Sequence, residues 1–414
     1  MIPKPPVSLV VGFPRAQSSR ELAKLHRKFK LRQDEKLDIV NGYSIEVPAN
    51  QLDSYLEALP ESAKVMVDEP FFPSPKTSSP RRRRRGVRLS DSLESSPSKS
   101  SKPYISRPTE LEELHAQGLR GEGSTIAVID SGIQSHPDFE GRVKYSKNFG
   151  RTKSKNNSKS YWHGTHVAGI AAGDGKKVDG VAPEAEIINL RIESPKQAIK
   201  AIQWAVENKE KHSIDILNLS LGIPDRLPSE QDPFAQATQQ AINAGIITIV
   251  ASGNEGQQCS SGTCHGTISS PGTLPDAITV GAYDDSGTPE LDDDRMWSQS
   301  SLGPTALDKT EKPDLVAPGT RIFAPKAKGS RLGTRSTWNL YHADSGSSMA
   351  TPMVSGAAAL LLQVDPNLSH HEMKDILTES ALPIDSAESY EQGAGRLNLA
   401  KAIELARTRA SGNS

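Results

Sequence analysis

The sequence predicts an α/β protein in which helices cover both faces of a mostly parallel sheet, preceded by a small α+β unit. Apolar runs alternate with helical segments such as QAIKAIQWAVENK between residues 126 and 280. Strands with Val, Ile and Leu at nearly every position are typical of a parallel sheet that is buried on both faces. The 414 residues exceed one average domain, so a second, smaller unit fits beside this sheet. The expected strands are Ile126–Ile129, Ile187–Leu190, Ile214–Leu219, Ile246–Val250 and Ile278–Val280.

The small unit is expected over residues 1–72 and has the element order βαββαβ. Val7–Phe13 is predicted as its first strand, and a helix is predicted to begin after Ser18. Ser18 and Glu21 have the spacing of a capping box, in which the serine side chain accepts a hydrogen bond from the main chain of the first turn. Alternating apolar residues that end at Val47 predict a half-buried strand.

A linker is expected over residues 73–104, where Ser, Pro, Lys and Arg dominate. Such a composition does not bury enough apolar surface to fold. Its run of arginines, Arg81–Arg85, either attracts nucleic acid or acidic lipid, or belongs to a solvated tether that is open to proteolytic cutting. We favour the tether.

The remaining residues, 105–414, are predicted to form the α/β domain. Two of its helices have the spacing of capping boxes at their starts, Thr109 with Glu112 and Ser369 with Glu372. A last helix is expected to begin at Asn398.

Charge and composition limit the partners. The chain has 49 basic and 50 acidic residues, so neither nucleic acid nor a membrane is expected as its main partner. The first residues lack the apolar core and cleavage site of a secretory signal, and no run of about 18 apolar residues occurs. A cytoplasmic location is therefore the default expectation. A disulfide between Cys259 and Cys264 would instead indicate a secreted protein, and two reduced thiols are the alternative.

Three short motifs supply an acid, a base and a nucleophile: VIDSG with Asp130, HGTHVAG with His163, and GSSMATP with Ser348. Hydroxyl attack on an amide needs a base that takes the proton and a carboxylate that orients the base. Asp130 directly follows a predicted strand, and sites in parallel sheets lie at the carboxyl ends of strands. A carboxylate that only caps the next turn is the structural alternative for Asp130.

The second motif contains two histidines, His163 and His166, which at first suggest a metal site. Zinc proteases need a glutamate next to the first histidine and a spacing of four residues, and this motif has neither. We therefore predict no catalytic metal. His163, at the expected start of a helix, is the better base, and His166 is interpreted as an interior histidine.

The nucleophile and the oxyanion donor follow from the last two motifs. Ser348 is expected to open a buried helix whose positive end favours an anion, with Pro352 in its first turn. Ser345 and Ser347 are alternative nucleophiles by residue type alone. Asn254, at the end of a predicted strand, either donates its amide to the oxyanion or is only a turn residue; such a donor contributes roughly 3 kcal/mol to transition-state stabilisation.

The four motifs occur in the order Asp, His, Asn, Ser, and from about Ile105 to Ala406 the chain resembles the subtilases, the subtilisin-like serine endopeptidases. The resemblance implies a subtilisin-like fold and assigns roles. Asp130 orients the base, His163 acts as general base and acid, Ser348 attacks, and Asn254 stabilises the oxyanion. The substrate then lies as an added strand between two segments. These segments are Ser220, Leu221 and Gly222 on one side and Ala251, Ser252 and Gly253 on the other.

The first unit resembles the inhibitory propeptide of many subtilases, which has a ferredoxin-like α+β fold. This implies a monomeric zymogen that cuts polypeptides, is blocked by its own N-terminal domain and releases that domain by cleavage in the linker. No cofactor is required. Calcium is an optional structural ion, because Asp138 matches a ligand position whereas the loop between Gly173 and Gly180 is shorter than the family's main calcium loop.

Two other functions stay open at this stage. One is a non-catalytic, subtilase-like interaction protein. The other is an esterase or transferase that uses the same serine. The segment after Arg191 is also shorter than the edge segment that usually flanks the substrate in subtilases, so recognition at outer subsites is an open question.

Overall fold

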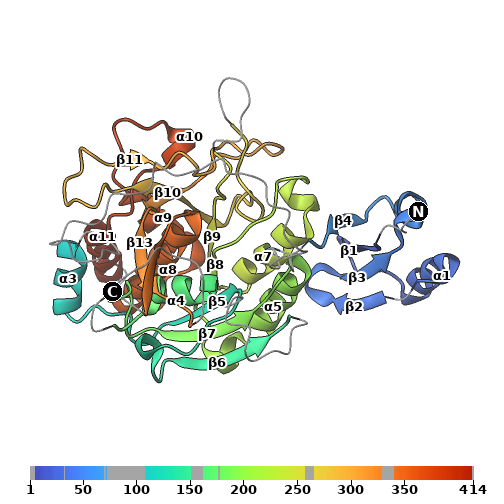
Figure 1. Cartoon of the computed structure of the whole chain (residues 1–414), viewed down its shortest axis with the longest axis horizontal. Helices are drawn as coiled ribbons and strands as arrows, with labels where there is room; N and C mark the ends of the chain where they lie inside the picture. Colours follow the sequence, from blue (N-terminus) through green and yellow to red (C-terminus); the bar gives the residue numbers. More distant parts are fainter. Residues whose placement is uncertain are drawn as a thin grey trace, which may run out of the picture.

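The computed structural model describes residues 5–31, 33–69, 71, 108–150, 162–175, 178–256, 265–328 and 340–412. The predicted linker at residues 73–104 and the cysteines Cys259 and Cys264 lie outside these ranges. The described residues form a small unit at the N-terminus and a large α/β domain (Figure 1).

The N-terminal unit has the predicted order βαββαβ. Its strands form one antiparallel sheet of four, in the order β2-β3-β1-β4. One face of the sheet and the helices α1 and α2 enclose a core of its own that includes Leu9, Val11 and Tyr43. The elements are β1 (Val7–Gly12), α1 (Ser19–Phe29), β2 (Gln33–Leu37), β3 (Gly42–Val47), α2 (Leu52–Glu57) and β4 (Lys64–Val67).

The predicted capping boxes have different outcomes. Ser18 is the N-cap residue of α1, and its carbonyl accepts from the N–H groups of Glu21 and Leu22, but its side chain makes no cap bond. Thr109 does not precede its helix either, since α3 (Pro108–Ala116) already includes Pro108, which suits a first turn. The box of Ser369 and Glu372 is confirmed.

The large domain is built on an eight-stranded sheet in the order β11-β10-β9-β8-β5-β7-β6, with β12 beside β10. All pairings are parallel except that of β11 with β10. Each predicted strand is present, which confirms the fold class. The strands are β5 (Thr125–Asp130), β6 (Val143–Asn148), β7 (Glu186–Arg191), β8 (Ile216–Leu219), β9 (Ile247–Ala251), β10 (Ile278–Asp284), β11 (Arg295–Met296) and β12 (Leu315–Pro318).

Successive residues of β5 point into two different cores, as a sheet covered on both faces requires. Ile126 and Val128 belong to the core with α4 (Trp162–Ala172) and α8 (Ser347–Val364). Ala127 and Ile129 belong to the core on the opposite face. That face is covered by α5 (Pro195–Glu207) and α7 (Pro233–Asn243). The other elements are α6 (Lys209–His212), β13 (Ile322–Pro325), β14 (Tyr341–Asp344), α9 (His370–Glu379), α10 (Ser389–Gln392) and α11 (Leu399–Gly412).

Within the described residues, α8 is the one helix that is long and apolar enough to cross a membrane. It is 83% buried inside the fold, where it packs against α4 and the central strands. Its composition is therefore explained by its place in the core of the domain.

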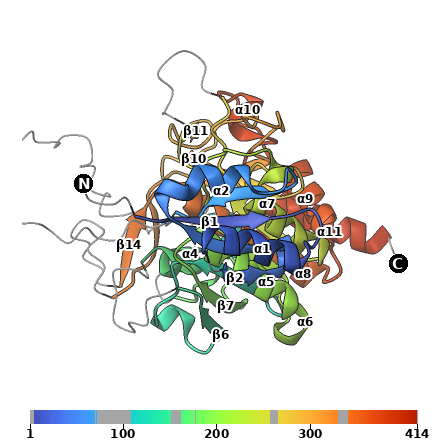
Figure 2. The ribbon, with the colours of Figure 1, turned by 90° about the vertical axis from the view of Figure 1, so that its right-hand side faces the viewer.

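The N-terminal unit lies against α5 and α7, as Figures 1 and 2 show from two directions. Residues from the outer face of its sheet share one apolar cluster with these helices. The two units therefore bury a common core, with Val10, Leu37, Val40 and Met66 as the contribution of the N-terminal unit.

Candidate active site

The predicted acid and base meet at the carboxyl end of the sheet. Asp130 is the last residue of β5 and is fully buried, and His163 is the second residue of α4. Nδ1 of His163 lies 2.8 and 2.9 Å from the two carboxylate oxygens of Asp130. A carboxylate only accepts, so the proton is on Nδ1 and Nε2 is left as the basic nitrogen.

The start of α4 is held close to β5. The N–H of Gly164 donates to Oγ of Ser131 at 3.0 Å. A Cβ atom at position 164 would lie 2.6 Å from the carbonyl oxygen of Gly132, so this contact requires glycine. The small residue in the HGTH motif thus allows the imidazole of His163 to reach the carboxylate.

The environment of His163 favours its charged form. Burial of the ring lowers its pKa, but the charge of Asp130, the hydrogen bond to it and the charge of Asp344 outweigh burial and raise the pKa of His163 above 6.5. Asp344 is the last residue of β14. Of the two carboxylates that raise the pKa of His163, it is the one that the sequence did not predict.

Ser348 lies in the first turn of α8, which begins one residue earlier at Ser347. Its hydroxyl donates to the carbonyl of Ser220 at 3.1 Å, and the residue is half-buried. Pro352 is not in the first turn as predicted, because the helix starts too early for that. Pro352 has no N–H, so it does not donate to the carbonyl of Ser348 four residues back.

The side chain of Asn254 is fixed by the residue before Ser348. Oδ1 of Asn254 accepts from the N–H of Ser347 at 2.9 Å and from its hydroxyl at 3.0 Å. Asn254 is itself exposed, so its amide nitrogen is the end that is presented outward. Ser347, which was weighed as a nucleophile, therefore has an orienting role.

The two predicted substrate segments follow neighbouring strands. Ser220, Leu221 and Gly222 come after β8, and Ala251 ends β9, with Ser252 and Gly253 directly after it. Because β8 and β9 pair in parallel, both segments leave the same edge of the sheet, where Asp130 also lies. The structure therefore brings all the predicted site residues to one edge.

Glu255 belongs to this edge and was missed, although it directly follows Asn254 in the motif ASGNEG. Its carboxylate accepts from the N–H of Asn254 at 2.7 Å and from the hydroxyls of Ser269 and Ser301 at 3.2 and 3.0 Å. Gly253 has a φ of +107°, and a Cβ there would lie 2.5 Å from this carboxylate. Glu255 thus fixes the turn that carries Asn254.

The other histidine of the motif is an interior residue. His166 is fully buried, and its Nε2 donates to the carbonyl of His342 at 3.1 Å. Burial lowers the pKa of His166 well below its ordinary value, so its ring is neutral. In the described part of the chain, no group of three or more His, Cys, Asp or Glu side chains is arranged to hold a metal.

Near Asp138, where the resemblance allowed calcium, a guanidinium group binds main-chain carbonyls. Arg142 donates to the carbonyls of Asp138, Ala172 and Ala185. One carboxylate oxygen of Asp138 accepts from the hydroxyl of Tyr341 at 2.9 Å, and the other is buried without a partner. A calcium ion needs six to eight oxygen ligands, and here the nearby carbonyls already bind a cation of the protein. These three carbonyls are therefore occupied by Arg142 and are not free to bind calcium.

Comparison of the sequence and the fold with known proteins shows which family the chain is similar to. Residues 121–395 match the subtilase family. Serine protease AprX of Bacillus subtilis is 35% identical over 350 residues, which cover 75% of this chain and 76% of that protein. Subtilisin E of Bacillus subtilis is 31% identical over 313 residues, 73% of this chain and 72% of that protein.

The crystal structure of fervidolysin from Fervidobacterium pennivorans, a keratinolytic enzyme related to subtilisin, has the same fold. It matches 96% of this chain with a TM-score of 0.69 at 21% identity, and the chain spans 61% of it. The chain belongs to the subtilase family of serine endopeptidases. It is a hydrolase of that class with the subtilisin-like fold, and the chemistry of the class needs no cofactor.

Proposed function

We propose that this endopeptidase is a self-processing zymogen that cuts polypeptides with Asp130, His163 and Ser348 as its triad and Asn254 in its oxyanion hole. The observation that carries the proposal is the buried pair of Asp130 and His163 at the edge of the sheet where Ser348 and Asn254 also lie.

In the proposed mechanism, the hydroxyl of Ser348 leaves the carbonyl of Ser220, donates to Nε2 of His163 and attacks the scissile carbonyl. His163 takes the proton and passes it to the leaving amine as the C–N bond breaks. It then takes a proton from the water that hydrolyses the acyl group on Ser348 and returns it to the serine oxygen, while Asp130 holds the ring in one tautomer. The amide of Asn254 and the N–H of Ser348, at the positive end of α8, stabilise the oxyanion. The carboxylate of Glu255 keeps Asn254 in place.

Polypeptide substrates are expected to lie between the segment from Ser220 to Gly222 and the segment from Ala251 to Gly253. An extended chain pairs with main-chain groups there, so affinity depends little on side chains. Selectivity then comes from the side-chain contacts that surround these two segments.

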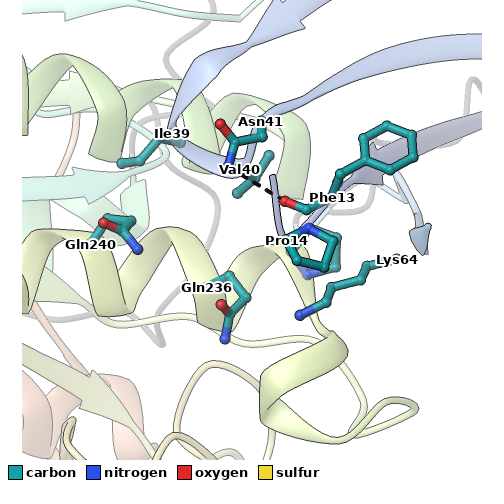
Figure 3. A pocket seen from close by; sticks show the side chains of 10 residues that line it. Phe13, Pro14, Ile39, Val40, Asn41, Lys64, Gln236 and Gln240 are labelled. Carbon is teal, nitrogen blue, oxygen red and sulfur yellow. Dashed lines mark hydrogen bonds between the residues drawn. The ribbon is translucent and has the colours of Figure 1, made fainter. Parts of the chain in front are cut away.

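The N-terminal unit is proposed as the intramolecular inhibitor. Lys200 of α5 pairs with Glu35 at 2.6 Å, and the side chain of Gln203 accepts from the N–H of Ile39 at 3.3 Å. Figure 3 shows Ile39, Val40 and Phe13 above Gln236 and Gln240 of α7, around a cavity of about 70 Å³. These contacts join the N-terminal unit to α5 and α7.

The end of this unit supports a role in blocking the site. The N–H of Phe71 donates to the carbonyl of Glu193 at 3.0 Å, and its ring joins the apolar cluster that contains Leu221 of the predicted substrate segment. Phe71 thus contacts the segment after β7 and the start of α7.

Labelling with a fluorophosphonate tests the proposal, because covalent reaction requires an activated serine. Labelling of the wild type that is lost in His163→Ala supports the enzyme. Absence of labelling in the wild type, with hydrolysis of no polypeptide, favours the non-catalytic interaction protein. Hydrolysis of small esters but of no polypeptide favours the esterase or transferase.

The pH dependence of hydrolysis should depend on Asp344. The reaction needs neutral His163, so kcat/KM should rise with pH through a value above 6.5. Asp344→Asn removes a charge that favours the protonated ring, so this rise should move to lower pH. The exposed control Asp292→Asn should leave the profile in place. A profile that does not move in Asp344→Asn would contradict the contribution of Asp344 to the pKa of His163.

Calcium is not expected to stabilise the loop that Arg142 holds. The unfolding temperature of the wild type should be the same with a chelator and with added calcium. Arg142→Ala should lower the free energy of unfolding by about 3 kcal/mol, because three carbonyls lose their donor. The control Lys144→Ala removes an exposed ion pair with Glu186 and should cost under about 1 kcal/mol. A lower unfolding temperature of the wild type in chelator would contradict this view.

Two properties stay predictions. A monomer is expected. The compartment is to be inferred from the redox state of Cys259 and Cys264. Titration of free thiols in the unfolded, unreduced protein distinguishes the two compartments, since a disulfide favours secretion.

A further inference from the structure

An aromatic ring packs on the proposed base, and the mechanism above does not use it. Trp162 is the first residue of α4 and directly precedes His163. The centroids of the two rings lie 5.1 Å apart, and the ring planes meet at 87°. This geometry is that of an edge-to-face aromatic pair. The imidazole of His163 is therefore held by an indole as well as by the carboxylate of Asp130.

The hydrogen bond to Asp130 does not by itself fix the plane of the imidazole. Nδ1 of His163 lies 2.8 and 2.9 Å from the two carboxylate oxygens, so it keeps an acceptor when the ring turns slightly. The last torsion of a histidine side chain has broad minima, which allow such a turn. The turn moves Nε2 away from the hydroxyl of Ser348. An edge-to-face neighbour opposes the turn, because the attraction depends on the angle between the rings.

The indole is backed by the core of the domain. Its centroid lies 6.4 Å from that of His342, and the ring of His342 packs against that of His166 at 4.5 Å. Both histidines are at most 2% exposed, and Trp162 is half-buried. A ring with this backing has little room to move. Trp162 therefore offers a firm surface to His163.

Of the three histidine rings in this cluster, His163 is the one that carries charge near the pH of the reaction. Burial lowers the pKa of His342 to about 4 and the pKa of His166 well below 6.5, so both rings are neutral. The carboxylates of Asp130 and Asp344 raise the pKa of His163. Trp162 adds no charge to this set. Its contribution to the reaction therefore depends on its shape and its contact.

We propose that Trp162 is a positioning residue, which fixes the plane of the His163 imidazole so that Nε2 stays directed at the hydroxyl of Ser348. The same orientation serves the later steps, in which His163 gives a proton to the leaving amine and takes one from water. This inference rests on the proposed function, because it requires that His163 is the base.

The test compares kcat and KM on one internally quenched peptide for the processed wild type and three variants of Trp162. Trp162→Leu and Trp162→Met remove the ring, so kcat should fall roughly tenfold, the upper end of what an aromatic pair contributes. Trp162→Phe keeps a ring and should retain kcat within about twofold of the wild type. KM should stay the same in all three variants, because the proposed contact is with the base and not with the substrate.

The measurement is made on the high-pH side of the wild-type profile, where His163 is neutral, so that a change in its pKa does not alter kcat. Trp204→Phe is the matched control. Trp204 lies in α5, on the opposite face of the sheet, where its ring stacks on Tyr145 with centroids 5.0 Å apart. This variant should keep the kcat and KM of the wild type. Unfolding temperatures show which variants are folded, and the two non-aromatic variants give independent measurements.

The outcomes separate the inference from the function on which it rests. Absence of peptide hydrolysis in the wild type would count against the proposed function. An unchanged kcat in the folded non-aromatic variants would overturn the positioning role while the protease assignment stands. A higher KM with an unchanged kcat would also overturn it and make Trp162 a substrate contact. A loss of kcat in Trp162→Phe as large as in Trp162→Leu would contradict the aromatic contact as its cause.

Discussion

Ser348→Ala should leave the full chain uncut and reduce peptide hydrolysis by roughly 10⁶-fold, the order of magnitude found for the nucleophile of subtilisin. The variant keeps α8 and its buried contacts, because Ser348 contributes only a side-chain bond to the carbonyl of Ser220. The chain length of the purified protein and kcat on a peptide substrate are the two measurements. Unfolding temperature shows whether the fold is intact.

Ser345→Ala is the matched control for this experiment. Ser345 is exposed, lies three residues away and accepts from the N–H of Arg321 at 2.8 Å, so its loss should change kcat little. Normal processing in Ser348→Ala would show that another group, or another protease, cuts the chain. Loss of activity in Ser345→Ala, with activity kept in Ser348→Ala, would identify Ser345 as the nucleophile.

Asp130→Asn should lower kcat about 10⁴-fold without preventing folding. The asparagine has similar shape, but its neutral amide no longer stabilises a proton on Nδ1 of His163, and the charged ring loses its counter-ion. The wrong tautomer presents a proton instead of a lone pair to Ser348. The effect is measured as kcat on the high-pH side of the wild-type profile, where His163 is neutral.

Asp174→Asn is the control for charge loss, because Asp174 is exposed and pairs with Arg120 at 3.4 Å, away from the sheet edge. It should keep wild-type kcat. Retention of kcat within tenfold of the wild type in Asp130→Asn would mean that the carboxylate only caps the turn after β5, which is the alternative raised by the sequence.

The fold was predictable where local pattern and burial agree. The strands at Ile126 and Ile187 are apolar at nearly every position because each face of the sheet meets a separate core. By contrast, β6 alternates half-buried and exposed residues at the edge of the sheet, and β12–β14 are only four residues long. Short edge elements depend on their neighbours, so their local sequence gives a weak signal.

The site residues could be predicted where they belong to a recognisable sequence motif. Asp130, His163 and Asn254 lie where the motifs indicate: Asp130 ends β5, His163 is in the first turn of α4, and Asn254 lies in the turn after β9. Asp344 is different: its relation to His163 arises from the pairing of β14 with β13, which no local pattern reveals. The guanidinium of Arg142 is a further case, since two of its three acceptors, the carbonyls of Ala172 and Ala185, are distant in the chain.

The position of Ser348 ties catalysis to the stability of the whole domain. Its helix passes through the main core and contacts α4 and the strands β8, β9 and β10. Residues in such elements exchange their amide hydrogens only when the entire domain opens. Heat should therefore abolish peptide cleavage and core hydrogen-exchange protection in a single step, with no folded but inactive species in between.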